Sequence, residues 1–404
     1  MWRYGPRMDL RSYAATEVAE HAAEGNLTRR EAIRRLALLG ITGATAAALL
    51  AACSSSATTA ASTSTSAAAT TASTAAATTA ATAPTSAPVA TSAATTTAGA
   101  ASSATTAPPA TGAALEVSQI TFPGPAGELK GAFSAAPKPK GAVLIVHEIF
   151  GLSAHFLKLP GRFAASGYTA LVVDLLSREG GTAAIADQGQ ITAKIVGAGV
   201  ERHLADLRAG LDELGKRAPG VKLGMVGFCF GGGMTWSMLN AGEPRLAVAA
   251  PFYGPGVDGA DFSKSKAAVL GVYAENDARV NASRDAMEAA LTKAGLVHEI
   301  KTFPGVGHQF FNDTGSAYNP TQAEAAYPEL MSWFARTSTD SVGPDGVGAP
   351  KVSTGWSRVF NGRDHLSNAT STGVPERSAP QGLRTDERPL PRRHRRRRSV
   401  SLLV

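Results

Sequence analysis

The chain has 404 residues, with 39 Lys and Arg against 32 Asp and Glu, and a formal net charge of +7. Its two cysteines, Cys53 and Cys229, are too few for a disulfide framework, and we expect no intramolecular disulfide. The sequence contains no P-loop, its histidines are scattered, and its Gly-x-Gly-x-x-Gly run at residues 254–259 lies in a loop and does not lead into a helical pattern, so it is no dinucleotide-binding signature. We therefore expect neither a nucleotide cofactor nor a metal site.

The N-terminal segment, residues 1–53, contains two patterns that resemble export signals. Residues 28–35 read Thr-Arg-Arg-Glu-Ala-Ile-Arg-Arg and resemble a twin-arginine signal. The uncharged apolar run that follows is slightly short for a membrane-spanning helix, which needs about 20 apolar residues. It ends in Leu-Ala-Ala-Cys, which resembles a bacterial lipobox with Cys53 as the lipidated residue. We expect an exported protein, lipid-anchored at the outer face of the cytoplasmic membrane or at the cell surface. An uncleaved anchor is the alternative.

Two further segments lack the pattern of a packed core. Residues 54–115 contain no charged residue and are almost wholly Ala, Ser and Thr, which predicts a disordered tether. Residues 337–404 are rich in Gly, Pro, Ser and Arg, which predicts a disordered basic tail. The arginine run at residues 392–398 could bind anionic lipid, wall polymer or nucleic acid. We favour an extension without function and expect no nucleic-acid partner.

Residues 116–336 alternate between strand and helix patterns. Residues 119–122 and 129–133 predict a hairpin, and apolar strands follow at residues 141–146, 167–176, 221–226, 268–272 and 296–303. Helical patterns lie at residues 156–166, 199–216, 232–240, 282–294 and 322–336. Apolar strands separated by amphipathic helices predict an α/β fold, a mostly parallel sheet with helices on both faces. Its length suits one domain with an ample core.

The strand at residues 221–226 leads into Gly-Phe-Cys-Phe-Gly-Gly at residues 227–232, and a helix follows. This is the strand, Gly-x-nucleophile-x-Gly, helix pattern of a nucleophile elbow, with cysteine in place of serine. The glycines are needed because a Cβ at these positions would clash within so tight a turn. The N–H groups at the start of the helix favour a thiolate. The pattern predicts Cys229 as a nucleophile, with a buried structural cysteine as the alternative.

A nucleophile of this kind needs a base. Beyond Cys229 the predicted domain holds two histidines, His298 and His308. His298 lies within an alternating strand, which favours a structural or solvent-facing role. His308 lies in the loop that follows the strand, where a base has the required placement. His308 is therefore the candidate base.

The base in turn needs an orienting acid. Asp277 directly follows an apolar strand and is the candidate, with Glu275 and Asp258 as competitors. The alternative role for Asp277 is to cap the helix that begins near residue 282.

An oxyanion hole is expected from the backbone N–H of Phe230 and from a second N–H in the loop after the strand at residues 141–146. The same loop carries Glu148, which we expect to project into the cleft beside Cys229. There it could hydrogen-bond the neutral thiol and help pass its proton to His308. A local salt bridge is the alternative for Glu148.

Together these residues resemble the dienelactone hydrolase family, also called carboxymethylenebutenolidases, of the α/β-hydrolase superfamily. The resemblance covers about residues 116–336 and rests on residues 147–151, 167–176, 227–232, 275–277 and 305–308. It implies a Cys229, Asp277 and His308 triad. It also implies that Glu148 contacts the resting nucleophile and that Ile149 and Phe230 supply the oxyanion N–H groups. The family is implied to be a cofactor-free, single-domain hydrolase of lactones and esters.

One departure concerns the substrate. The founding enzymes bind the carboxylate of their lactone with two arginines, and one of them lies four residues after the catalytic histidine, where this chain has Asn312. For the other, residues 180–199 offer only Lys194, and Arg178 aligns better elsewhere. Asparagine has neither the charge nor the fork of arginine. We predict a preference for neutral short-chain esters or lactones in a pocket lined by Phe150, Phe310, Phe311 and Asn312.

We interpret the sequence as a surface-tethered, monomeric, thiol-dependent hydrolase of a small ester or lactone. A first rival, from a different class, is a non-catalytic surface binding protein on a hydrolase scaffold, because fold does not imply function. A second is an adhesion protein led by the basic tail.

Overall fold

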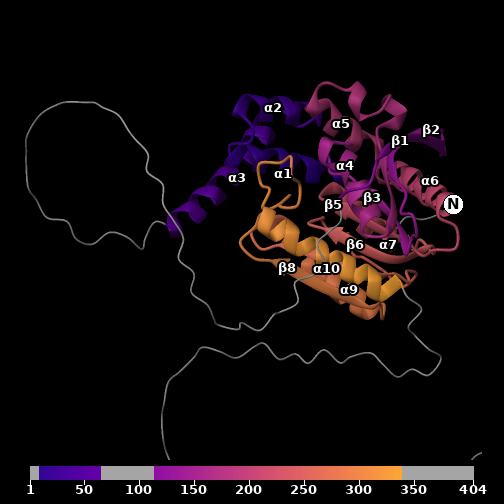
Figure 1. Ribbon diagram of the computed structural model, residues 1–404. Coiled ribbons are helices and arrows are strands. Elements are labelled where there is room, and N and C mark those ends of the chain that lie inside the picture. Colours follow the sequence, from indigo (N-terminus) through magenta and orange to yellow (C-terminus); the bar gives the residue numbers. More distant parts are fainter. Residues whose placement is uncertain (1–8, 65–112, 339–404) are drawn as a thin grey trace, which may run out of the picture. The chain divides into compact units, whose positions relative to one another are not determined.

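The computed structural model describes residues 9–64 and 113–338. Within these ranges the chain forms an 8-stranded sheet in the order β1-β2-β4-β3-β5-β6-β7-β8 (Figure 1). β1 and β2 form an antiparallel hairpin, β2 pairs antiparallel with β4, and the remaining neighbours are parallel. The strands are β1 (Ser118–Gly124), β2 (Gly127–Ser134), β3 (Gly141–Val146), β4 (Tyr168–Asp174), β5 (Leu223–Phe228), β6 (Leu246–Phe252), β7 (Ala268–Ala274) and β8 (His298–Phe303).

Helices cover both faces of this sheet, as alternation along β5 shows. A Cβ on Gly224 would lie 2.4 Å from the Phe334 ring, so this position faces α10 (Pro320–Ser338). The next residue, Met225, points to the other face because side chains alternate along a strand. Met225 pairs with Leu144 of β3, and a Cβ on Gly210 of α6 (Val200–Arg217) would lie 2.9 Å from Leu144. The mostly parallel, two-sided architecture predicted from the sequence is confirmed.

The other domain helices follow from these two faces. α4 (Ala154–Ala165) packs with α10 through the edge-to-face rings of Phe163 and Tyr327, so these two helices share a face. α7 (Phe230–Asn240) contacts α6 on the opposite face. The remaining helices are α5 (Gln188–Ala198), α8 (Ala278–Asn281) and α9 (Arg284–Lys293), with short 3₁₀ turns at Ser177–Glu179 and Thr182–Ala184. The central strands β3, β4 and β5 are buried along their whole length.

The N-terminal segment folds against the domain as α1 (Leu10–Ala23), α2 (Arg29–Leu38) and α3 (Gly43–Ser64), drawn in indigo in Figure 1. Asp9 caps α1, and Thr28 caps α2 by accepting a hydrogen bond from the Glu31 N–H. α1 contacts α2, α3 and α5. α2 is held to α5 by an ion pair of Arg34 with Asp187 at 2.7 Å. None of the described helices combines the length and apolar character needed to cross a bilayer.

The predicted elements differ from the structure in several places. The expected helix at residues 282–294 corresponds to α9, and the short helix α8, which was not foreseen, precedes it. β6, α5 and α1 were not foreseen. The first part of the predicted tether, up to Ser64, is helical because α3 continues through it. The rest of that tether, residues 65–112, and the tail from residue 339 lie outside the described residues.

Candidate active site

Cys229 sits at the tip of a tight turn between β5 and α7, and its backbone is strained. Its φ is 58° and ψ is −121°, a conformation that residues with a Cβ rarely adopt. Glycine is required on either side: a Cβ on Gly227 would lie 1.9 Å from the Gly231 carbonyl oxygen, and one on Gly231 would lie 2.3 Å from the Val146 carbonyl oxygen. The nucleophile elbow expected from the sequence therefore forms, with cysteine at its tip.

Asp277 and His308 converge on this thiol from the loops that follow β7 and β8. His308 Nδ1 lies 2.5 Å from Asp277 Oδ2, which holds the proton on Nδ1 and turns Nε2 towards the nucleophile. His308 Nε2 and Cys229 Sγ both belong to a cluster whose ligand atoms lie within 4.8 Å of one another. The three residues named as a triad are thus brought together, in the order nucleophile, acid, base along the chain.

Asp277 makes both kinds of contact that the sequence left open, although the helix that it caps is α8, which begins before residue 282. Its Oδ2 contacts His308, while its Oδ1 accepts the Val280 N–H at 3.1 Å and caps α8. Of the competing acids, Glu275 accepts the Gly305 N–H at 2.7 Å and so helps to fix the loop that carries the base. Asp258 is exposed.

The two segments expected to form the oxyanion hole lie side by side. Gly231 approaches the carbonyl groups of Val146 and His147 so closely that α7 begins against the end of β3. Phe230 is the first residue of α7, where backbone N–H groups have no intrahelical acceptor. Ile149 lies in the loop after β3 and is fully buried. The role of these two N–H groups remains a prediction.

Glu148 is buried beside the triad, but its hydrogen bonds differ from the expected ones. Oε1 accepts from the Tyr253 hydroxyl at 3.2 Å, and Oε2 accepts from Asn312 Nδ2 at 2.8 Å. No hydrogen bond joins it to Cys229 among the described residues. Burial raises the pKa of Glu148 to about 7, against the lowering effect of Asn312. Asn312 therefore serves as a donor to Glu148 and supplies no charge.

The raised pKa of Glu148 has a measurable consequence. The folded protein holds the Glu148 proton over a pH range in which the unfolded chain has lost it. The stabilisation that this proton gives to the folded state is therefore complete below about pH 4.5 and is lost as the pH rises to about 7. Over that range wild type should lose about 3 kcal/mol of unfolding free energy that Glu148→Gln does not lose. Urea unfolding of both proteins at about pH 5 and about pH 8.5 measures the difference. Parallel stability curves would contradict it.

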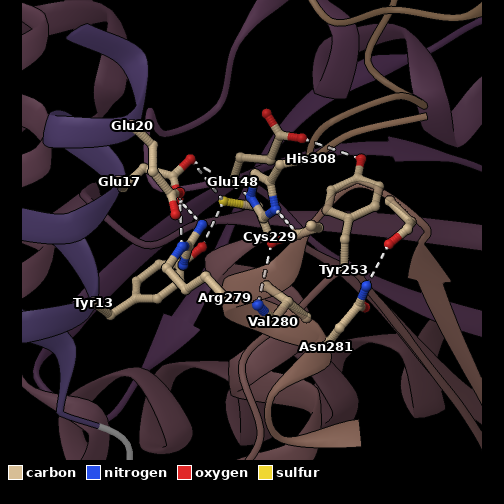
Figure 2. A network of polar contacts seen from close by, with 12 residues as sticks. Tyr13, Glu17, Glu20, Glu148, Cys229, Tyr253, Arg279, Val280, Asn281 and His308 are labelled. Atoms are coloured by element: carbon tan, nitrogen blue, oxygen red, sulfur yellow. Dashed lines mark hydrogen bonds and ion pairs between the residues drawn. The ribbon is translucent and has the colours of Figure 1, made fainter. Parts of the chain in front are cut away.

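α1 places two further side chains on the nucleophile, as Figure 2 shows. The Tyr13 hydroxyl lies 3.0 Å from Cys229 Sγ. Glu17 Oε1 lies 4.0 Å from the same sulfur and 3.5 Å from His308 Nε2. Tyr13 and Glu17 are four residues apart and so lie on one face of the helix. Cys229 is 0% exposed in this arrangement.

Arg279 of α8 secures these contacts. Its guanidinium donates to Glu17 Oε2 at 2.5 Å and to Glu20 Oε2 at 2.8 Å, and it lies 4.7 Å from the Tyr13 ring centroid. The two positions of the family's arginines do lack arginine, as the sequence indicates. Arg279 lies near the thiol from a different position, two residues after Asp277. Arg178 does not fill the role, since it pairs with Asp206.

These contacts determine the protonation of the triad. Burial alone would lower the pKa of His308, but the carboxylates of Glu17 and Asp277 outweigh it and hold that pKa well above its usual value. Burial, with Glu17 nearby, raises the pKa of the Cys229 thiol. With α1 in place these shifts favour the imidazolium form of His308, the neutral thiol of Cys229 and the carboxylate form of Glu17.

The same atoms could hold a metal ion. Glu17 Oε1, Cys229 Sγ and His308 Nε2 lie within 4.8 Å of one another, and a thiolate, an imidazole and a carboxylate are ligands that suit zinc. The expectation of no metal site did not foresee this cluster, because Glu17 lies far from the other two along the chain. A metal bound there would occupy both the nucleophile and the base.

The aromatic residues assigned to a substrate pocket have mixed surroundings. Phe150 is half-buried and stacks on His21 of α1 at 5.6 Å. Phe311 stacks on Phe228 at 5.2 Å within the core, and Phe310 packs edge-on against Tyr253 at 5.5 Å. Phe310 and Phe311 are thus explained by packing in the core, without a role in a substrate pocket. Phe150 is the ring of the three that contacts α1.

Sequence reasoning missed four site residues, Tyr13, Glu17, Tyr253 and Arg279. Tyr253 follows directly after β6, at the edge of the sheet where the triad loops also lie, and recognition of β6 would have found it. Tyr13 and Glu17 precede the export-like signal, and only their spacing along a helix gave a clue.

Comparison with known proteins identifies the family of the domain. The model of the dienelactone hydrolase family matches residues 130–338, about half of the chain. The chain belongs to the dienelactone hydrolase family. The carboxymethylenebutenolidase homologue of Saccharolobus solfataricus is 29% identical over 243 residues, which are 51% of this chain and 94% of that protein. The homologue of Salmonella typhi is 31% identical over 224 residues, and that of Escherichia coli K12 is 30% identical over 220, covering 82% and 81% of those proteins and 51% and 50% of this chain.

The solved structures show the α/β-hydrolase fold. A dienelactone hydrolase-like promiscuous phosphotriesterase from metagenomic libraries superposes with a TM-score of 0.50 at 20% identity, covering 56% of this chain and 100% of that one. In this dienelactone hydrolase family member, α1, α2 and α3 lie outside the family match. The helix that contacts Cys229, α1, therefore lies outside the residues that the family model matches.

Proposed function

We propose that this family member hydrolyses a carboxylic ester or lactone through an acyl-enzyme on Cys229. The observation that carries the proposal is the strained elbow that aims Cys229 at His308, with Asp277 2.5 Å behind the imidazole. A strained backbone at a reactive side chain is costly and is retained where function uses it. A structural cysteine would need neither the strain nor the paired imidazole.

The reaction follows from these positions. Cys229 Sγ gives its proton to His308 Nε2 and forms a bond to the substrate carbonyl carbon. The resulting oxyanion accepts hydrogen bonds from the Phe230 and Ile149 N–H groups. The C–O bond to the alcohol then breaks as His308 returns the proton to the leaving oxygen. Water, deprotonated by His308, attacks the thioester and releases the acid and the thiol. Asp277 keeps the imidazole oriented and stabilises its positive charge.

The rival is a non-catalytic binding protein on the same scaffold. A chromogenic aryl ester separates the two, because an acyl-enzyme releases one equivalent of the coloured alcohol before steady turnover begins. A burst whose amplitude is proportional to the protein concentration, and that disappears after alkylation of Cys229, supports the proposal. Binding of the ester without release of alcohol, in the chain cleaved free of α1 as well as in the full chain, would support the rival.

Substrate charge is the finer part of the proposal, and Arg279 decides it. Asn312 argues for neutral esters or lactones, while Arg279 offers a guanidinium close to the nucleophile once Glu17 and Glu20 withdraw. We expect Arg279→Gln to lower the ratio of kcat/KM for a carboxylate-bearing lactone to that for its methyl ester by about 10- to 100-fold. The ratio cancels any effect on α1 that both substrates share. An unchanged ratio would retain the original prediction of a neutral substrate.

We also propose that the protein is exported and lipid-anchored through Cys53, on the strength of the residues that resemble a twin-arginine signal and a lipobox. Cys53→Ala should then remove the protein from the membrane fraction of a bacterium that processes lipoproteins. Wild-type protein in the soluble cytoplasmic fraction would refute this.

A further inference from the structure

α1 occupies the place where a substrate has to approach the thiol. Its buried side chains recur at helical spacing along one face: Leu10, Tyr13, Ala14, Glu17 and Val18. Tyr13 and Glu17 are the two of these that reach Cys229, and Figure 2 shows them entering from the indigo helix towards the sulfur. Because Cys229 is fully buried with α1 in place, an ester carbonyl cannot reach Sγ until the helix moves.

The contacts also oppose the chemistry. His308 Nε2 has to accept the thiol proton, yet Glu17 Oε1 lies 3.5 Å from it and favours the imidazolium, which has no lone pair to offer. The Tyr13 hydroxyl occupies the hydrogen-bonding position of the sulfur at 3.0 Å. The Glu17 carboxylate, close to both the thiol and the imidazole, resembles the acid product of ester hydrolysis. α1 therefore blocks the site in space and places polar groups of its own against both the thiol and the imidazole.

Several contacts outside the triad hold α1 in this position. Arg279 pairs with both Glu17 and Glu20, and its burial makes each of these pairs worth more than a surface pair. His21 stacks on Phe150 next to the oxyanion loop. α2, which follows α1, is itself tied to α5 through Arg34 and Asp187. The helix is thus anchored at its middle, at its end and through the next element.

We propose that α1 is an inhibitory plug, and that the enzyme stays latent until the N-terminal segment carrying α1 is removed. Latency of an enzyme rests on the proposed hydrolase function, whereas the closure of the Cys229 thiol by α1 does not. The segment contributes no strand to the sheet, which is formed by β1 to β8 between Ser118 and Phe303. Cleavage before Cys53 would separate both α1 and α2 from the domain. Arg29 and Arg30 remain exposed while α1 is docked, so the export-like signal can be read with the site closed.

The test uses the full chain with Cys53→Ser, which leaves Cys229 as its only cysteine. Two rates are measured: alkylation of Cys229 by iodoacetamide and hydrolysis of a chromogenic ester. The parent is compared with Tyr13→Phe/Glu17→Gln, which removes the hydroxyl and the charge and keeps the size of both side chains. Glu24→Gln is the matched control, since it removes one carboxylate from the exposed end of α1, where its contact is Asn26. A further form carries a specific protease site within residues 65–112 and is measured before and after cleavage and removal of the N-terminal fragment.

The double variant should raise both rates by roughly 10- to 100-fold, because loss of a buried charge-assisted contact shifts the closed state towards the open one by that factor. The control should match the parent, and cleavage should raise both rates at least as far as the double variant does. Unchanged rates in both the double variant and the cleaved form would overturn the plug. A fall in hydrolysis in the double variant would also overturn it, since Tyr13 or Glu17 would then assist the reaction. Faster alkylation without hydrolysis in any form would keep the plug and refute the proposed hydrolase.

Discussion

Replacing Cys229 with alanine should lower kcat/KM for ester hydrolysis on the order of 10⁴-fold or more, because no acyl-enzyme can form without the sulfur. The fold should survive, since alanine is smaller than cysteine and the strain at φ 58° is set by the backbone of the elbow. The measurement is steady-state hydrolysis together with circular dichroism, on chains in which the N-terminal segment has been cleaved and removed. Near-normal turnover by the alanine variant would refute the mechanism.

Cys229→Ser provides a sharper control, because the hydroxyl keeps the shape and the hydrogen bonding of the thiol. We expect at most a trace of activity, since a hydroxyl is a much weaker acid than a thiol and the site offers one imidazole as its base. Full activity in the serine variant would mean that Cys229 is replaceable and that the elbow, not the thiol, carries the reaction.

The matched domain was largely predictable because its signals are local and strong. β3 occupies the predicted residues 141–146, since a short apolar run between turns has few alternatives. β6 was missed although Leu246–Phe252 is equally apolar. A charged residue, Arg245, directly precedes this apolar run, and Pro251, which is unfavourable within a strand, lies near its end. α5 was missed because its helix begins at Gln188 with two glycines in eleven residues, a composition that argues against a helix.

The candidate triad was predictable for a different reason. Each member follows a strand, and the carboxyl ends of parallel strands meet at one edge of the sheet, so chain order alone places Cys229, Asp277 and His308 together. The plug was not predictable in this way. Glu17 reaches His308 from a helix that no sheet register positions, and the pairing of Arg279 with Glu17 and Glu20 joins residues about 260 positions apart. Contacts of this kind depend on how a helix docks, which a hydrophobic pattern does not encode.

Gly231→Ala should unfold the elbow, with a loss of unfolding free energy of about 3 kcal/mol or more. A Cβ there would lie 2.3 Å from the Val146 carbonyl oxygen and 2.7 Å from that of His147. Both obstacles are backbone atoms at the end of β3, so no side-chain rotation relieves the overlap, and α7 has to move away from the strand. That movement would also separate the Phe230 N–H from the Ile149 loop, and hydrolysis should fall even in the fraction that remains folded.

The matched control for this glycine is Gly215→Ala in α6. Nothing lies within 4 Å of a Cβ at Gly215, and alanine there should stabilise the helix by about 0.5–1 kcal/mol because it has less conformational freedom to lose. Urea unfolding should therefore show a lower free energy of unfolding than wild type for Gly231→Ala and a higher one for Gly215→Ala. Ester hydrolysis should fall only in Gly231→Ala. If Gly231→Ala is as stable and as active as Gly215→Ala, the contact between α7 and the end of β3 is looser than 2.3 Å implies, and the oxyanion hole assigned to Phe230 and Ile149 loses its structural basis.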